Sequence, residues 1–190
     1  QLLCSLDHRN IPKVTDTFEE NGKQFLVMDY VDGETLEDLL EGRTAPFSES
    51  EVLGWAEQLC DVLTYLHGLT PPVIFRDLKP GNVMILRDMK TVKLIDFGIV
   101  RFFKPSSQTD TVKLGTPGYA PPEQYGKGGQ SDARSDVYAL GALLHHLLTL
   151  RDPGSDPFKF PSISLSNKKV SAHVDSAIAK AVQPRPADRW

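Results

Sequence analysis

The sequence predicts an α+β fold in which β-hairpins are combined with a group of helices. Two pairs of apolar runs are each joined by a short polar turn, which is the pattern of a β-hairpin. Two longer stretches repeat apolar residues at helical spacing. The expected strands cover 14–19, 24–30, 83–86 and 92–95, and the long helices cover 48–69 and 135–150. The chain is therefore expected to carry most of its helices after the first hairpin.

The first hairpin is indicated by Asn21-Gly22, because Asn-Gly is among the strongest short-range hairpin signals. Residues 2–11 precede it and predict the end of a helix passing into a loop. After it, residues 35–41 predict a short helix. Gly42 is expected to end this helix, since glycine readily adopts the left-handed conformation found after helix ends.

The two long helices carry different signals. The first begins with Ser48 and Glu51, a pair that forms a capping box, and Gly68 marks its end. The second is apolar on nearly every face after Asp136, which predicts a buried central helix. A loop-rich stretch follows, and residues 173–182 predict one more helix.

The composition limits the class of protein. A length of 190 residues, 40% of them hydrophobic and 24% charged, fits one globular unit with a hydrophobic core. A net charge of -4 with scattered Lys and Arg predicts no nucleic-acid partner. The chain shows no membrane segment and no signal peptide, and a cytoplasmic location is expected. Because it begins at Gln1 in mid-pattern, it is expected to be a fragment.

Four polar residues flank the second hairpin. Asp77, Lys79 and Asn82 precede its first strand, and Asp96 follows its second. An antiparallel pair places the start of one strand beside the end of the other, so these residues should gather at the open end. Carboxylate and amide oxygens suit a hard divalent cation, and a lysine suits a phosphate. The sequence therefore predicts metal-assisted chemistry on a phosphorylated substrate.

Three motifs in this region carry a family resemblance. They are Phe-Arg-Asp-Leu-Lys-Pro-Gly-Asn at 75–82, Asp-Phe-Gly at 96–98 and Gly-Thr-Pro-Gly-Tyr-Ala-Pro-Pro-Glu at 115–123. In this order and with these gaps, the chain resembles the eukaryotic-like (Hanks-type) serine/threonine protein kinases, in a style typical of bacteria. The resemblance implies a protein-kinase-like fold, mostly the helical C-terminal lobe plus the last strands of the N-terminal lobe.

The resemblance also implies a division of the chain. Residues 1–31 would be the remnant of the N-terminal lobe, with the end of its regulatory helix, strands 4 and 5 and the hinge. Residues 32–190 would be the C-terminal lobe, with the catalytic loop at 75–82 and the activation segment at 96–123. The Gly-rich loop and the strand lysine of the family would precede Gln1. The isolated chain is therefore expected to be inactive.

By resemblance, the site transfers the γ-phosphoryl group of ATP to Ser or Thr hydroxyls of protein substrates. Asp77 would orient the hydroxyl and accept its proton, and Lys79 would steady the transferred group. Asp96 would bind Mg²⁺, with Mn²⁺ as an alternative, and Asn82 would hold a second metal ion or orient Asp77. The residues expected to hold the nucleotide are Met28, Asp29, Val31, Glu34, Lys79, Asn82, Met84 and Asp96. Met28 would be the gatekeeper at the back of the adenine pocket. A core residue on a strand is the alternative interpretation, and both can hold.

Further residues receive structural or regulatory roles from the resemblance. Phe75 replaces the usual His and would pack beneath Phe97, next to Gly98. Arg76 implies a pocket for a phosphorylated residue, with self-phosphorylation at Thr109 or Thr111 as candidates. An ordinary loop with hydroxyls explains either threonine as well. The other residues with such roles are Thr116 in the activation segment, Glu123 paired with Arg189, and Asp136 bonded to catalytic-loop amides.

Some alternatives stay open. Asp136 would cap its helix if it does not hold the catalytic loop. A pseudokinase or docking scaffold uses the same fold without phosphoryl transfer. A small-molecule phosphotransferase of related fold is disfavoured by the segment around Glu123.

Overall fold

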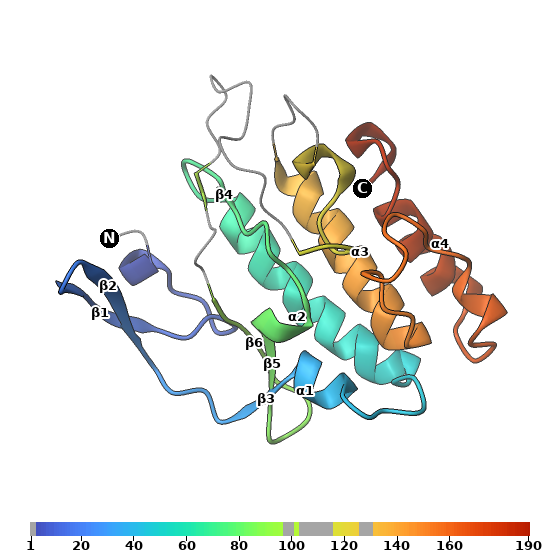
Figure 1. The fold of residues 1–190 in the computed structure, drawn as a ribbon, viewed down its shortest axis with the longest axis horizontal. Helices are drawn as coiled ribbons and strands as arrows, with labels where there is room; N and C mark the ends of the chain where they lie inside the picture. Colours follow the sequence, from blue (N-terminus) through green and yellow to red (C-terminus); the bar gives the residue numbers. More distant parts are fainter. Residues whose placement is uncertain (1–2, 97–100, 103–115, 126–130) are drawn as a thin grey trace.

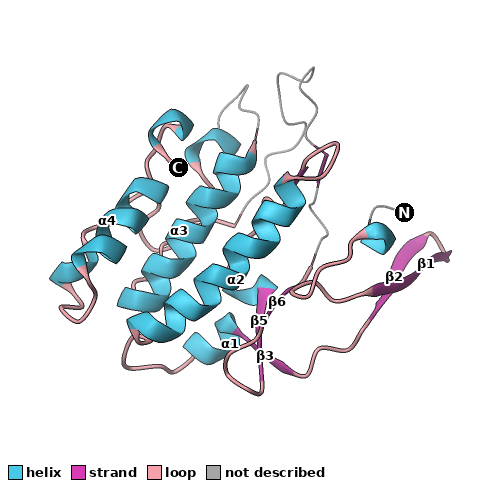
Figure 2. Cartoon of the chain, turned by 180° about the vertical axis from the view of Figure 1, so that it is seen from behind, coloured by secondary structure: helices cyan, strands magenta, loops and turns pink. Residues whose placement is uncertain are grey.

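The molecule is built around a row of three helices. The computed structural model describes residues 3–96, 101–102, 116–125 and 131–190 (Figure 1). Helices α2 (Glu49–His67), α3 (Ala133–Thr149) and α4 (Ala172–Ala181) lie side by side, with α3 in the middle. Figure 2 shows the same order from behind, with the small sheets on the far side of α2 from α4. No helix in the described part of the chain is both long and apolar enough to cross a membrane.

Helix α2 forms as the sequence predicts. The Ser48 side chain accepts a hydrogen bond from the Glu51 N–H, and the Glu51 carboxylate accepts one from the Ser48 N–H, so the predicted capping box is present. Gly68 is the C-cap. The apolar face is fully buried; it consists of Val52, Trp55, Ala56, Leu59, Val62, Leu63 and Leu66. Burial of this face against the rest of the core supplies most of the stability of such a helix.

Helix α3 begins two residues earlier than predicted. Its N-cap is Asp132, whose side chain accepts from the Arg134 N–H, while the Asp132 N–H donates to the Ser135 hydroxyl. The alternative that Asp136 caps this helix is therefore wrong. The helix is buried on most faces, as predicted for a central helix.

The first hairpin pairs β1 (Val14–Glu20) with β2 (Lys23–Met28) in antiparallel register. Asn21 and Gly22 both have positive φ, at 52° and 73°, which is the backbone that a tight two-residue hairpin turn requires. Strand β2 ends earlier than predicted. Met28 is 37% exposed, so its interpretation as a core residue is wrong. The reason is that β1 and β2 form a two-stranded sheet with no further strand paired to it among the described residues.

The second hairpin is also present and gains a third strand. Strands β5 (Val83–Leu86) and β6 (Val92–Leu94) pair as predicted, and β3 (Gly33–Thr35) pairs antiparallel with β5. Gly33 permits this close approach, since a Cβ on it would lie 2.3 Å from the Ile85 carbonyl oxygen. A separate pair joins β4 (Val73–Ile74) to β7 (Arg101–Phe102). The sequence predicted neither β3 nor this second pair.

Short helices complete the fold. Helix α1 (Leu36–Leu40) begins at the N-cap Thr35, and Gly42 follows it with a φ of 68°, as predicted. The start of the chain forms only a short 3-10 turn, not the end of an α-helix. The 3-10 helices are Leu3–Ser5, Pro80–Asn82, Pro122–Gln124, Ile163–Leu165 and Pro186–Asp188.

One hydrophobic core joins the helices to the three-stranded sheet. Large fully buried side chains come from α1, α2, β5, β6 and α3, and they include Leu36, Leu59, Ile85, Leu94 and Leu143. The residues around 75–82, which lie between β4 and β5, contribute Phe75 and Leu78 to the same core. The first half of the site loop is therefore anchored in the core by buried side chains.

Two glycines inside long helices provide a matched test of this packing. A Cβ on Gly141 of α3 would lie 2.8 Å from the Ala181 Cβ and 2.9 Å from the Val182 Cγ1, whereas a Cβ on Gly54 of α2 would meet nothing within 4 Å. We expect Gly141→Ala to lower the free energy of unfolding by about 1–3 kcal/mol through overpacking. Gly54→Ala should raise it by about 0.5–1 kcal/mol through helix propensity. Urea unfolding of both variants measures this, and equal shifts would contradict the close contact between α3 and α4.

Candidate active site

The centre of the site is the carboxylate of Asp77, which is 8% exposed. The Asn82 side-chain amide donates to the Asp77 carbonyl oxygen at 2.7 Å and to Asp77 Oδ2 at 3.0 Å. The Lys79 ammonium lies 3.2 Å from the same Oδ2. The Thr116 hydroxyl donates to Asp77 Oδ1 at 2.8 Å. Three side chains thus hold both oxygens of one buried carboxylate, and this contact brings residue 116 to the site across 39 residues of sequence.

Asp96 follows the end of β6 and lies next to this cluster along the backbone. The Ile95 N–H donates to the Asn82 carbonyl oxygen at 2.9 Å. This bond closes the open end of the β5–β6 hairpin, as the antiparallel pairing predicts. Asp96 itself is exposed and has a φ of 59°. A non-glycine residue in this conformation is uncommon and is often found at functional sites.

The donor set at this hairpin end suits a hard divalent cation. Both hydrogens of the Asn82 amide are used by Asp77, so its Oδ1 remains as the acceptor of that side chain. Asp96 adds a carboxylate at the exposed side. Magnesium is commonly held by one or two protein oxygens together with substrate phosphates and water. No group of three or more His, Cys, Asp or Glu side chains forms a metal site within the described ranges.

The backbone of this loop is held from below by Asp136, which is fully buried. Asp136 Oδ2 accepts from the Phe75 N–H at 2.9 Å, and its Oδ1 accepts from the Arg76 N–H at 2.8 Å. The predicted contact between Asp136 and the loop amides is therefore confirmed. Arg76 has a φ of 71°, a left-handed conformation that costs about 1–3 kcal/mol for such a residue. The two hydrogen bonds to Asp136 stabilise it.

His67 is a site residue that the sequence did not reveal. Its Nε2 lies 2.7 Å from Asp136 Oδ2 and shares this oxygen with the Phe75 N–H. With a carboxylate oxygen opposite, Nε2 carries the proton and donates. His67 and Asp136 are 69 residues apart, so no local sequence pattern connects them.

Four of the residues predicted to hold a nucleotide, Asp29, Val31, Glu34 and Met84, lie after β2 and up to β5. The Asp29 N–H donates to the Lys13 carbonyl oxygen at 2.9 Å, so a contact from Asp29 to a base would use its own carbonyl. Glu34 is exposed on β3, and Met84 is half-buried on β5. Val31 is half-buried before β3. The remaining predictions at Phe97, Gly98, Thr109 and Thr111 lie outside the described residues.

A groove begins beside Asp77 and extends away from it. Its volume is about 730 Å³. Its lining includes Lys79 and Thr116, the residues that contact the Asp77 carboxylate. Tyr119 and His146 lie along it, joined by a 2.6 Å hydrogen bond between the Tyr119 hydroxyl and His146 Nδ1. Burial, with a further contribution from two nearby carboxylates, raises the pKa of Tyr119, and burial lowers the pKa of His146. This pair is therefore neutral over the physiological pH range.

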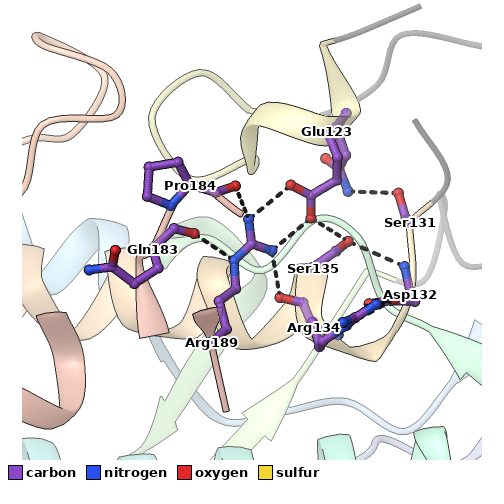
Figure 3. Close-up of polar contacts among 9 residues, drawn as sticks. Glu123, Ser131, Asp132, Arg134, Ser135, Gln183, Pro184 and Arg189 are labelled. Carbon is purple, nitrogen blue, oxygen red and sulfur yellow. Dashed lines mark hydrogen bonds and ion pairs between the residues drawn. The ribbon is translucent and has the colours of Figure 1, made fainter. Parts of the chain in front are cut away.

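A buried ion pair ties the segment after the groove to the end of the chain. Arg189 binds Glu123 through two parallel contacts, Nη1 to Oε1 at 2.7 Å and Nη2 to Oε2 at 2.9 Å (Figure 3). The remaining guanidinium hydrogens go to the carbonyl oxygens of Arg134, Gln183 and Pro184. The Ser135 hydroxyl also donates to Glu123 Oε1 at 2.9 Å. The predicted pairing of Glu123 with Arg189 is confirmed.

This pair allows a stability prediction with an internal control. The Arg189 side chain is fully buried, so Arg189→Ala leaves the Glu123 carboxylate without its partner and should lower the free energy of unfolding by about 3–5 kcal/mol. Arg185 forms an ion pair with Asp188 at 2.7 Å but is 81% exposed, and Arg185→Ala should change stability little. Urea unfolding of both variants is the measurement. Similar losses for the two would contradict the role assigned to the buried pair.

Comparisons with known proteins agree with this geometry. The model of the protein kinase domain matches residues 1–183. The whole chain aligns with the serine/threonine-protein kinase PrkC of Bacillus subtilis at 34% identity, covering 30% of that protein. It aligns over its whole length with the serine/threonine-protein kinase PknB of Mycobacterium tuberculosis at 35% identity, covering 32% of it. The chain thus spans about a third of the length of these curated relatives. It belongs to the protein kinase family and is similar to its bacterial Hanks-type serine/threonine members.

Proposed function

We propose that this chain is the catalytic part of a serine/threonine protein kinase, which transfers the γ-phosphoryl group of ATP to Ser or Thr hydroxyls of protein substrates. The observation that carries the proposal is the buried Asp77 carboxylate, held on both oxygens by Lys79, Asn82 and Thr116. Membership of the family supports the use of ATP and a divalent metal. In this proposal residues 1–31 are the remnant of the N-terminal lobe and residues 32–190 are the C-terminal lobe.

The proposed mechanism assigns one task to each side chain. Asp77 accepts the hydrogen bond of the substrate hydroxyl and takes its proton as that oxygen bonds to the γ-phosphorus; the bond from this phosphorus to the β–γ bridging oxygen breaks, and ADP leaves. Lys79, already beside Asp77, faces the transferred group and balances the charge on its oxygens. Thr116 fixes the second carboxylate oxygen and borders the acceptor side of the site. The lysine and threonine at these positions favour Ser/Thr acceptors by resemblance to that branch of the family.

Asn82 and Asp96 are the proposed metal-binding residues. Bound there, Mg²⁺ (or Mn²⁺) would neutralise charge on the ATP phosphates. Asn82 has a second task, because its amide orients the Asp77 carboxylate. The proposed nucleotide contacts are backbone groups of Asp29 and Val31 to the base and Glu34 to the ribose. Met28 and Met84 are the proposed apolar neighbours of the base.

The regulatory part of the proposal concerns the activation segment, 96–123. Arg76 is the proposed anion-binding residue, and Thr109 and Thr111 are the proposed phosphorylation sites, with self-phosphorylation as the route. Phe75, which is almost fully buried, would support Phe97 and Gly98 of the metal-binding motif. Protein substrates are the proposed partners, and the cytoplasm is the proposed location of this catalytic part.

Replacement of Asp77 tests the proposed reaction. In the full-length gene product, we expect Asp77→Ala to lower kcat for phosphate transfer to a generic basic protein by at least about 10²-fold, since the general base is lost. The KM for ATP should change little, because Asp77 is not a proposed nucleotide contact. Transfer of labelled phosphate from ATP measures both. Asp61→Ala is the control, since Asp61 is a half-exposed carboxylate on α2 remote from the site.

Retention of most activity in Asp77→Ala would contradict the role of that carboxylate. If the unaltered protein transfers no phosphate, a scaffold is favoured over an enzyme. This holds whether or not the protein binds ATP in the presence of magnesium.

Replacement of His67 tests the support beneath the loop. Hydrogen bonds to charged groups contribute about 1.5–3 kcal/mol, so His67→Ala should lower kcat about tenfold or more while the KM for ATP stays nearly constant. His67→Gln keeps an N–H donor and should recover part of the loss. His173→Ala, an exposed histidine on α4, is the matched control. A loss in His67→Ala that appears only as a lower unfolding temperature, with kcat unchanged, would contradict a positioning role.

A further inference from the structure

We propose that Glu37 makes this site select substrates that carry an arginine or lysine close to the phosphorylated Ser or Thr. The inference rests on the proposed function and concerns the groove that begins at Lys79 and Thr116. Because these two residues touch the Asp77 carboxylate, a peptide whose hydroxyl reaches Asp77 must lie with its flanking residues in this groove. The side chains that line the groove therefore decide which flanking residues are accepted.

Glu37 lies against the catalytic loop because Gly81 has no side chain there. A Cβ placed on Gly81 would lie 2.5 Å from Glu37 Oε2, so the carboxylate occupies the space that any other residue at 81 would fill. Gly81 is directly between Pro80 and Asn82, in the 3-10 turn that follows Lys79. The Glu37 carboxylate of α1 thus lies against the 3-10 turn that follows Lys79.

The start of helix α1, from which the Glu37 side chain projects, is held by a capping box. Its capping box joins Thr35 and Asp38, with Asp38 Oδ2 accepting from the Thr35 N–H at 3.0 Å and from the Thr35 hydroxyl at 2.6 Å. Asp38 is therefore occupied by the cap. Glu37 is exposed, and no cationic side chain of the described residues lies within ion-pair distance of it. Its charge is available to a ligand.

The rest of the groove favours the same sign of ligand. The acidic groups along it are Glu37, Asp38, Glu41 and Asp152, and the basic ones are Lys79 and His146. Lys79 is paired with Asp77. His146 is bonded to the Tyr119 hydroxyl and, because burial lowers its pKa, carries no charge near neutral pH. The net negative charge that remains attracts a guanidinium or ammonium group.

The test compares two peptides in the full-length gene product. They are identical except for Arg or Gln at the residues flanking one acceptor Ser, and the measured quantity is the ratio of their kcat/KM values. We expect the ratio to favour the Arg peptide and to fall about two- to fivefold in Glu37→Gln, the upper part of the range for loss of an exposed ion pair. Gly81→Ala should lower the ratio in the same direction, because the added methyl group displaces the carboxylate. Glu57→Gln, an exposed glutamate on α2, should leave the ratio unchanged.

A second readout separates this inference from the proposed reaction. The Arg peptide with its acceptor Ser replaced by Ala cannot be phosphorylated, and its binding is followed by fluorescence anisotropy. Weaker binding in Glu37→Gln than in Glu57→Gln supports the inference without any turnover. Equal binding in these variants, or equal kcat/KM for both peptides, overturns it and leaves the proposed function intact. Binding that depends on Glu37 without phosphate transfer to any Ser peptide would contradict the proposed function alone.

Discussion

The structure of the site depends on one fully buried carboxylate, that of Asp136. A charge in the protein interior is tolerated only when its oxygens are saturated with hydrogen bonds. Asp136 meets this need with the N–H groups of Phe75 and Arg76 and with His67 Nε2. The loop is held in place for the same reason, because moving it away would leave the Asp136 carboxylate buried without these hydrogen bonds. It also explains how Arg76 keeps a left-handed backbone directly before Asp77.

The same end of helix α3 supports a second part of the site. Ser135, next to Asp136, donates to Glu123, and the carbonyl oxygen of Arg134 accepts from Arg189. The segment that contains Thr116 and the loop that contains Asp77 are thus both attached to the first turn of α3. The 2.8 Å contact between Thr116 and Asp77 then joins two segments with a common support. A helix buried on most faces is a suitable support, since packing leaves it little freedom to shift.

The features that the sequence predicted are those with local causes. The β5–β6 hairpin and the Ser48 capping box depend on residues a few positions apart, and both are present. The missed features depend on distant partners. Strands β3, β4 and β7 have two or three residues each, too few for a periodic pattern, and form only through pairing with remote strands. The sequence left open whether Asp136 caps its helix or holds the catalytic loop, because the loop amides that decide between the two are about 60 residues away.

The groove differs from the centre of the site in how it is built. Asp77 is held by Asn82, Lys79 and Thr116, and its loop is bound to α3 through Asp136. The acidic wall of the groove comes instead from the short helix α1 and from the exposed Asp152 beyond α3. A change at Glu37 therefore leaves the supports of Asp77 untouched, because none of them passes through α1. The chemistry and the choice of substrate can vary separately in such an arrangement. Gly81 is the exception, since it belongs to the catalytic loop and also makes room for the Glu37 carboxylate. Gly81 therefore couples the chemistry at Asp77 to the choice of substrate.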